Sequence, residues 1–181
     1  MATKPYIVYT DGSALKNPGP GGYGIVLRLG SQMTTLSKGF KLTTNNRMEI
    51  MAVIVALQTI GEGKKVEIHT DSEYTINAIT KWIFGWKKNN WIKHDGGSVT
   101  NRDLIEQLDE LVRLNKVTFI KVKAHVGIPD NELADKLAKE GAGNPTEIDE
   151  GYLEELAKPK PPVVNNNYQN KYKPWYYKKR A

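Results

Sequence analysis

Four carboxylates at separated points of the chain are the residues most able to do chemistry. They are Asp11, Glu49, Asp71 and Asp135, and each stands in a short polar motif next to apolar sequence. An unpaired carboxylate is costly to bury, so a buried group of them needs a compensating cation. The chain has no cysteine, and hard oxygen donors favour Mg²⁺ over zinc. These residue types therefore predict a divalent-metal site.

An antiparallel β-meander is expected to carry the first of these acids. Residues 6–10 form a short β-rich run that ends at Asp11, and the turn-prone segment 17–22 follows it. Two further strands are expected over 23–29 and 34–42. Three successive strands joined by short turns predict an antiparallel arrangement.

Helices and strands alternate in the rest of the chain. The expected helices cover 45–60, 72–79, 101–114 and 130–139, with a short extra helix near 82–89, and the expected strands cover 65–70 and 117–124. This order predicts an α/β fold with a five-stranded mixed sheet. Its later strands are expected to be joined by crossovers and covered by helices.

The predicted sheet can bring the acids together. Asp11 and Asp71 each end a strand, and ligand sites collect at the carboxyl ends of strands in sheets with parallel crossovers. Glu49 is expected in the first turn of its helix, facing the interior or a cleft. Asp135 shares a helical face with Glu132, which could support it. Taken one at a time, these acids could equally be turn, helix-start and exposed helix residues.

Four motifs in the same order and spacing favour a shared site for these acids, because together they resemble one family. They are TDGSxxxNPGPGG, TNNRMEI, TDSEY and VKAHVGIPDNELAD, and residues 5–145 resemble type 1 ribonucleases H. The resemblance implies a ribonuclease H-like fold and hydrolysis of the RNA strand of RNA–DNA hybrids by a two-metal-ion mechanism, leaving 5′-phosphate and 3′-hydroxyl ends. Two Mg²⁺ ions, for which Mn²⁺ could substitute, would activate the water and stabilise the charge that develops on the phosphate.

The resemblance also implies roles for particular residues. The four carboxylates are implied to bind metal, and His125 is implied to assist proton transfer or product release. Without the resemblance, a lone histidine in a loop could equally be a structural or surface residue. The implied substrate contacts are Asn17, Asn45 and Asn46 in the minor groove and Thr44 with Asn101 at a DNA phosphate. Asn17 could instead be a turn residue, and Asn45 a helix cap.

A basic, tryptophan-rich segment covers residues 81–93. It interleaves Trp82, Trp86 and Trp91 with Lys81, Lys87, Lys88 and Lys93 and resembles the basic protrusion of the family. Substrate contacts of Trp82, Lys87 and Lys88 are therefore expected, in keeping with the formal net charge of +6. The alternative is a helix with its tryptophans on a packed side and its lysines on a solvated side.

Length and composition favour one catalytic domain and a C-terminal extension. The chain has 181 residues, of which 39% are hydrophobic, and it shows neither an amino-terminal apolar segment nor an apolar run of membrane-spanning length. We therefore expect a soluble, cytoplasmic monomer without a membrane partner. The domain is expected over 1–145. The extension over 146–181 indicates a short acidic helix, a Pro-rich linker and a Tyr/Lys-rich tail that could bind nucleic acid or a protein partner, or fold back on the enzyme.

Two other functions stay open on the residues alone. A polynucleotidyl transferase or DNA nuclease could use a similar fold and a similar carboxylate cluster. A nucleic-acid-binding module without catalysis would have little use for all four acids, so their presence argues against it. The TNNRMEI motif, the basic segment and His125 favour the hybrid nuclease.

Overall fold

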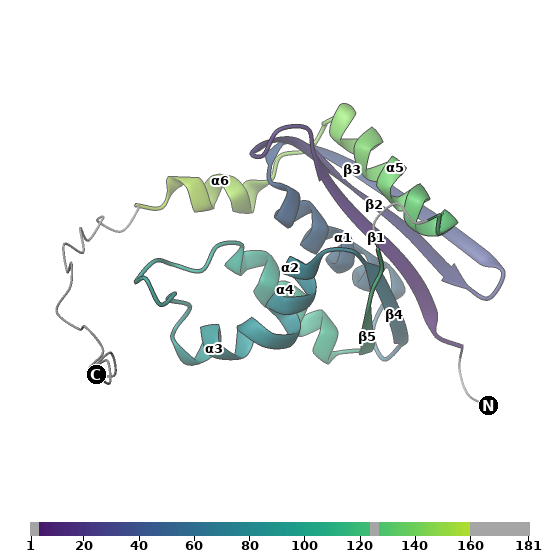
Figure 1. Cartoon of the computed structure of the whole chain (residues 1–181), viewed down its shortest axis with the longest axis horizontal. Coiled ribbons are helices and arrows are strands. Elements are labelled where there is room, and N and C mark those ends of the chain that lie inside the picture. Colours follow the sequence, from purple (N-terminus) through teal and green to yellow (C-terminus); the bar gives the residue numbers. More distant parts are fainter. Residues whose placement is uncertain (1–3, 124–126, 160–181) are drawn as a thin grey trace, which may run out of the picture.

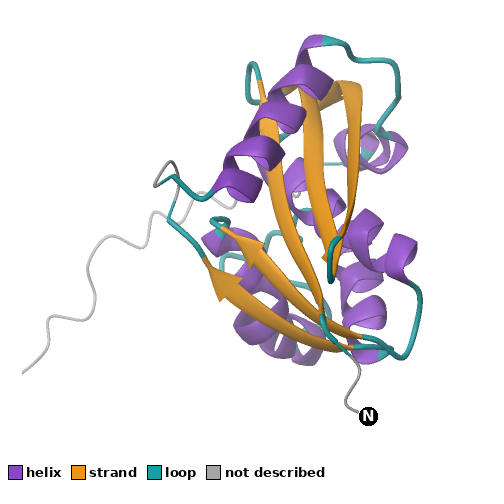
Figure 2. Cartoon of the chain, turned by 90° about the vertical axis from the view of Figure 1, so that its right-hand side faces the viewer, coloured by secondary structure: helices purple, strands orange, loops and turns teal. Residues whose placement is uncertain are grey.

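A five-stranded mixed sheet forms the centre of the described part of the chain. The computed structural model describes residues 4–123 and 127–159, and its sheet has the order β3-β2-β1-β4-β5 (Figures 1 and 2). The strands are β1 (Tyr6–Ala14), β2 (Gly19–Leu29), β3 (Gln32–Thr43), β4 (Lys65–Thr70) and β5 (Lys116–Lys121). The β1–β2 and β2–β3 pairs are antiparallel, and the β1–β4 and β4–β5 pairs are parallel. The predicted α/β fold is therefore confirmed.

Helices pack on both faces of this sheet. They are α1 (Asn45–Ile60), α2 (Glu73–Asn77), the π-helical η1 (Ala78–Trp82), α3 (Ile83–Lys88), α4 (Arg102–Arg113), α5 (Pro129–Gly143) and α6 (Glu150–Ala157). Helix α5 lies across β1 and β2 on one face, while α1 packs on the opposite face and contacts α4 (Figure 2). The helices expected over 72–79 and 82–89 form one continuous segment, because α2, η1 and α3 follow one another directly. Within residues 4–123 and 127–159, no helix combines the length and apolar character needed to cross a bilayer.

The hydrophobic core lies between the sheet and α1. Strand alternation turns one set of sheet side chains towards α1, whose middle is apolar on several sides. The fully buried side chains include Ile50, Val53 and Leu57 of α1 and Val8, Ile25 and Ile68 of the sheet. Burial of each contributes about 1.5–3 kcal/mol, so this packing fixes α1 firmly against the strands.

The first strand is longer than its sequence suggests. Strand β1 continues to Ala14, and Asp11 lies inside it, paired with Gly24 of β2. The expectation that the strand ends at Asp11 is therefore wrong. Glycines of the segment expected as a turn also permit close packing, since Gly22 lies in β2 and a Cβ there would be 2.4 Å from the backbone nitrogen of Ala142 in α5.

The short acidic helix expected in the extension is present as α6, and the segment before it packs on the domain. The backbone N–H of Lys41 in β3 donates to the carbonyl oxygen of Glu147 at 3.0 Å. Asp149 and Tyr152 are both buried. The described part of the extension is thus attached to the domain core, whereas the expected linker and tail over 160–181 lie outside the described residues.

Candidate active site

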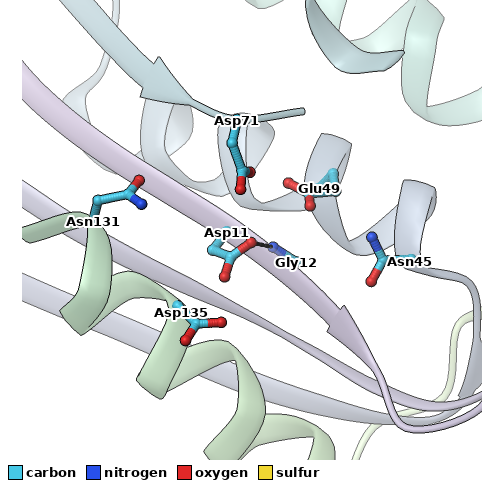
Figure 3. Close-up of a pocket in the computed structure, with 7 residues that line it drawn as sticks. All are labelled: Asp11, Gly12, Asn45, Glu49, Asp71, Asn131 and Asp135. Atoms are coloured by element: carbon cyan, nitrogen blue, oxygen red, sulfur yellow. Dashed lines mark hydrogen bonds between the residues drawn. The ribbon is translucent and has the colours of Figure 1, made fainter. Parts of the chain in front are cut away.

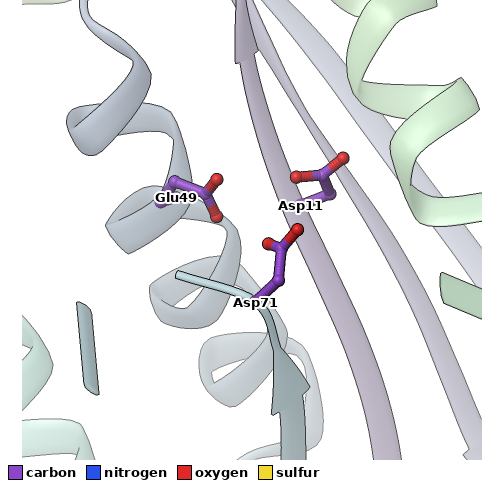
Figure 4. Close-up of side chains that lie close together, drawn as sticks. All are labelled: Asp11, Glu49 and Asp71. Carbon is purple, nitrogen blue, oxygen red and sulfur yellow. The ribbon is translucent and has the colours of Figure 1, made fainter. Parts of the chain in front are cut away.

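Three of the predicted carboxylates meet at one edge of the sheet. Asp11 lies in β1, Asp71 directly follows β4, and Glu49 projects from α1 (Figures 3 and 4). One carboxylate oxygen from each residue lies within 4.8 Å of the other two. Strands β1 and β4 are parallel neighbours, and Asp11 and Asp71 each come two residues after the paired positions Tyr9 and His69, so both acids reach the same edge of the sheet.

Glu49 reaches the cluster because α1 crosses β1 at very short range. A Cβ at Gly12 would lie 2.3 Å from the backbone nitrogen of Glu49, so the strand can approach the helix only at a glycine. The helix start is fixed by Thr44, whose side-chain oxygen accepts a hydrogen bond from the N–H of Arg47 at 3.3 Å. The first turn of α1 contains no acidic residue. The expected first-turn position of Glu49 is therefore wrong, whereas its expected orientation towards the interior or a cleft is confirmed, because Glu49 is buried and lines the acidic cavity.

Burial and mutual repulsion make two of these carboxylates, Asp11 and Glu49, hard to ionise. Burial, followed by the charge of Asp71 and the proximity of Asp135, raises the pKa of Asp11 to about 7. The pKa of Glu49 is raised well above its usual value by burial and then by the charges of Asp11 and Asp71. The N–H of Gly12 donates to Asp11 Oδ1 at 2.9 Å, which opposes the rise only in part.

The three clustered carboxylates form no ion pair within the described part of the chain. Among the residues that the structure describes, no lysine, arginine or histidine forms an ion pair with Asp11, Glu49 or Asp71. Within the same residues, the buried Oε2 of Glu49 has no hydrogen-bond partner. An unsatisfied oxygen in a group of hard donors fits a divalent cation bound by these three side chains.

Asp135 lies in the same cavity but outside the close group of three. The cavity measures about 200 Å³ and is lined by Asp11, Gly12, Asn45, Glu49, Asp71, Asn131 and Asp135 (Figure 3). Asp135 projects from α5 and accepts a hydrogen bond from Lys139 Nζ at 2.7 Å. Its charge is therefore partly compensated one helical turn away, unlike that of Glu49.

The neighbour of Asp135 in the cavity differs from the one expected. Glu132 is exposed and does not line the cavity, so the structure does not place it in support of Asp135. Asn131 is 7% exposed and does line the cavity. The spacing of four residues between Asn131 and Asp135 was a usable signal, because it places both on one face of a helix.

Four of the five asparagine and threonine residues expected to contact substrate lie at or beside the start of α1, and the fifth, Asn101, lies at the start of α4. Asn45 lines the acidic cavity, and its N–H donates to Asn17 Oδ1 at 3.2 Å. Asn46 is exposed next to it, and Thr44 caps the helix. Asn101 stands at the start of α4 with a φ of 59°, and its side chain donates to Tyr74 Oη at 3.0 Å.

The basic segment combines a packed aromatic row with exposed lysines. The ring centroids of Trp82 and Trp86 lie 5.7 Å apart, and those of Trp86 and Trp91 lie 6.2 Å apart. Lys87 is paired with Asp109 of α4, whereas Lys88 is exposed and makes no ion pair with any described residue. A groove beside the row is lined by Lys81, Trp82, Gly85, Trp86, Asn89, Ile92, Lys93 and His94. The two interpretations of this segment therefore coexist: its tryptophans pack, and most of its lysines stay available to an anionic ligand.

His125 lies outside the described residues, so its implied role stays a prediction.

The fold and site together define a class of enzyme. Oxygen ligands on a parallel strand pair and a buried helix can hold divalent ions, and a basic groove on the same chain suits a polyanionic substrate. This is the arrangement of a metal-dependent nuclease.

Comparisons with known proteins give the family. Residues 3–143 match the model of the family described as RNase H. Ribonuclease HI of Haemophilus influenzae is 53% identical over 148 residues, which cover 82% of this chain and 96% of that protein. Ribonuclease H of Vibrio campbellii is 51% identical over 150 residues, which cover 83% of this chain and 97% of that protein. The chain therefore belongs to the RNase H family, and the resemblance found in its motifs is confirmed.

Solved structures agree with this assignment. LC9-RNase H1, described as a type 1 RNase H with the type 2 active-site motif, superposes with a TM-score of 0.71 at 30% identity, covering 87% of this chain and 83% of that chain. The PFV RNase H domain superposes with a TM-score of 0.64 at 26% identity, covering 80% of this chain and 98% of that chain.

Proposed function

We propose that this ribonuclease H hydrolyses the RNA strand of RNA–DNA hybrids with two divalent ions, Mg²⁺ or in its place Mn²⁺, and leaves 5′-phosphate and 3′-hydroxyl ends. The observation that carries the proposal is the convergence of oxygens from Asp11, Glu49 and Asp71, which form no ion pair with any described residue. When bound, the ions would supply an activated water and would stabilise negative charge on the phosphate and the leaving oxygen.

The chain's own residues would hold and orient the reacting groups. Asp11, Glu49 and Asp71 would provide fixed oxygen ligands, because each is positioned by a strand or by a buried helix. Asp135 would contribute a ligand from α5 after release from Lys139. His125 would transfer a proton or assist product release, since an unperturbed imidazole titrates near neutral pH.

Substrate recognition would surround the acidic cavity. Asn17, Asn45 and Asn46 would contact the minor groove, where 2′-hydroxyls distinguish RNA from DNA. Thr44 and Asn101 would bind a DNA phosphate, and Trp82, Lys87 and Lys88 would contact the backbone further away. The clustering of the first three at the start of α1, beside the cavity, supports this arrangement.

A comparison of substrates tests the proposal. The full chain is incubated with labelled RNA–DNA hybrid, duplex DNA and duplex RNA, with and without Mg²⁺, and the product ends are mapped. We expect metal-dependent cleavage of RNA in the hybrid alone. Cleavage of duplex DNA would favour a DNA nuclease, binding without cleavage would favour a binding module, and either result would overturn the proposal.

The last part of the proposal concerns oligomeric state, cellular location and the C-terminal tail. We propose a monomer that acts in the cytoplasm, and a tail over 160–181 that binds nucleic acid or a protein partner.

A further inference from the structure

Helix α6 is anchored at one end and lies close to the starts of α1 and α4. Arg47 of α1 binds Asp149, directly before α6, through Nε at 2.8 Å and Nη2 at 2.8 Å. It also binds Asp103, in the first turn of α4, through Nη1 at 2.9 Å and Nη2 at 2.7 Å. Tyr152 is buried next to this anchor. The N-terminal half of α6 is therefore held by a buried ion network.

The other end of α6 places an acidic side chain on α4. The backbone N–H of Asn101 donates to Glu155 Oε2 at 2.7 Å. Asn101 immediately precedes α4, so this N–H belongs to the group of amides at a helix start that favours an anion. A carboxylate of the chain itself thus occupies an anion position at the start of α4.

This contact is made by the less firmly held half of α6. Leu153 and Leu156 are 40% and 54% exposed, so little apolar packing fixes the last turns. Glu154 and Glu155 both stand near the C-terminal end of the helix, where the helix dipole disfavours negative charge. The last turn can therefore leave α4 at small cost while Asp149 keeps the first turn in place.

We propose that α6 is a strap whose Glu155 excludes nucleic acid from the start of α4 until a backbone phosphate displaces it. The inference rests on the proposed function, in which Asn101 binds a phosphate of the DNA strand. One N–H cannot donate fully to a carboxylate and to a phosphate at the same time, so the two anions compete. Free enzyme is held in the strapped state, and the hybrid binds more weakly than the open surface would allow.

A purely structural function of Glu155 leads to a different outcome. If Glu155 only stabilises the start of α4, its removal lowers the stability of the protein and leaves hybrid affinity unchanged or weaker. If it competes with phosphate, its removal lowers stability but tightens binding. Both alternatives predict lower stability, so the change in hybrid affinity distinguishes them.

The chain offers a matched control for this test. Glu154 is the adjacent residue in the same turn, is exposed, and makes no side-chain hydrogen bond or ion pair with any described residue. Glu155→Ala and Glu154→Ala remove the same charge, so a difference between them reports the contact with Asn101. Both are made in the full chain, with and without Asp11→Asn, which permits binding measurements without cleavage.

The experiment measures hybrid affinity by fluorescence anisotropy at several salt concentrations, together with Tm. We expect Glu155→Ala to bind hybrid about three- to tenfold more tightly than Glu154→Ala, which corresponds to the typical net contribution of one competing hydrogen bond, and to have the lower Tm. When Asp11 is retained, so that the enzyme can cleave, Glu155→Ala should lower KM by a similar factor and leave kcat unchanged. Equal affinities, or weaker binding by Glu155→Ala, would overturn the strap while leaving the proposed function intact. Failure of the unsubstituted chain to bind or cleave hybrid would overturn both.

Discussion

Two charged clusters lie at the start of α1, and they are built in opposite ways. Arg47 is fully buried, yet its guanidinium makes paired hydrogen bonds to both Asp103 and Asp149. Glu49, two residues later, is also buried, but its Oε2 has no partner among the described residues. The same helix therefore buries one charge that the protein satisfies and one that it leaves for a ligand. The first kind stabilises the fold, and the second forms the proposed metal site.

Ionisation behaves differently in the two clusters. Burial would raise the pKa of Asp103, but its hydrogen bonds and attraction to Arg47 lower it overall. Burial would also lower the pKa of Arg47, and its two carboxylate partners raise it instead. In the acidic cavity, burial and like charges act in the same direction on Asp11 and Glu49. Of the two clusters, only the acidic cavity is therefore stabilised by binding a cation.

The largest predicted effect is the loss of catalysis by Asp11→Asn. This change removes one ligand charge and should lower the cleavage rate by a factor on the order of 10³ or more. Because it also removes repulsion, the metal-free protein should be at least as stable as the unsubstituted chain. Single-turnover hybrid cleavage and urea unfolding in EDTA check both parts. Global unfolding by Asp11→Asn would instead place Asp11 with the structural charges.

Arg47→Met should have the opposite pattern. It leaves two carboxylates, one of them buried, without their partner, and breaking such a network costs about 3–5 kcal/mol of unfolding free energy. Cleavage by the remaining folded protein should persist at low temperature, since Arg47 does not line the acidic cavity. Urea unfolding gives the free energy. A loss below about 1 kcal/mol would contradict the structural assignment of this cluster.

The sequence predicted the acidic cluster better than the ion network, for a physical reason. Asp11, Glu49 and Asp71 could be located because each stands at a recognisable point of a local motif. Arg47 pairs with residues 56 and 102 positions away, and such partners depend on tertiary packing rather than on local pattern. The acidic helix α6 was expected, but its attachment through Asp149 was not.

The fold was predicted in its order and less well in its boundaries. Alternation and helix signals identified the strands and helices, and the mixed sheet follows from their order. Glycine was one source of error, because Gly22 stands in the turn-prone segment 17–22 but belongs to β2, where its lack of a side chain lets α5 approach the strand. Asn131 shares a helical face with Asp135, yet only the packing of α5 on the sheet shows that this face meets the cavity.

The contributions of the two clusters to stability should also change with pH in opposite directions. The folded-state pKa of Asp11 lies near 7, above its ordinary value of 3.8, so between these values the folded chain binds more protons than the unfolded chain. Stability of the metal-free protein should therefore fall as pH rises from about 4 to about 7, by at most about 1.4 kcal/mol per pH unit for one proton. The lowered pKa of Asp103 acts the other way, and its contribution is lost as pH falls below about 4.

Urea unfolding in EDTA across pH 4.5–8 measures this dependence. Asp11→Asn should flatten it, and saturating Mg²⁺ should oppose the loss of stability at high pH, because the ion binds the folded state alone. A pH-independent stability in EDTA would show that the carboxylates are not held close together in the metal-free protein.

The smallest effects come from two glycines, and their contrast tests the packing of the ion network. A Cβ at Gly151 of α6 would lie 2.1 Å from Asp103 Oδ2 and 2.8 Å from Arg47 Nη2, so Gly151→Ala must displace the network. We expect a loss of about 1–3 kcal/mol with cleavage retained. A Cβ at Gly85 of α3 meets nothing within 4 Å, so Gly85→Ala should gain about 0.5–1 kcal/mol from helix propensity alone. Thermal and urea unfolding of both variants compare them directly. If Gly151→Ala were as stabilising as Gly85→Ala, α6 would not be packed against Arg47 and Asp103, and the anchor of the strap would be lost with it.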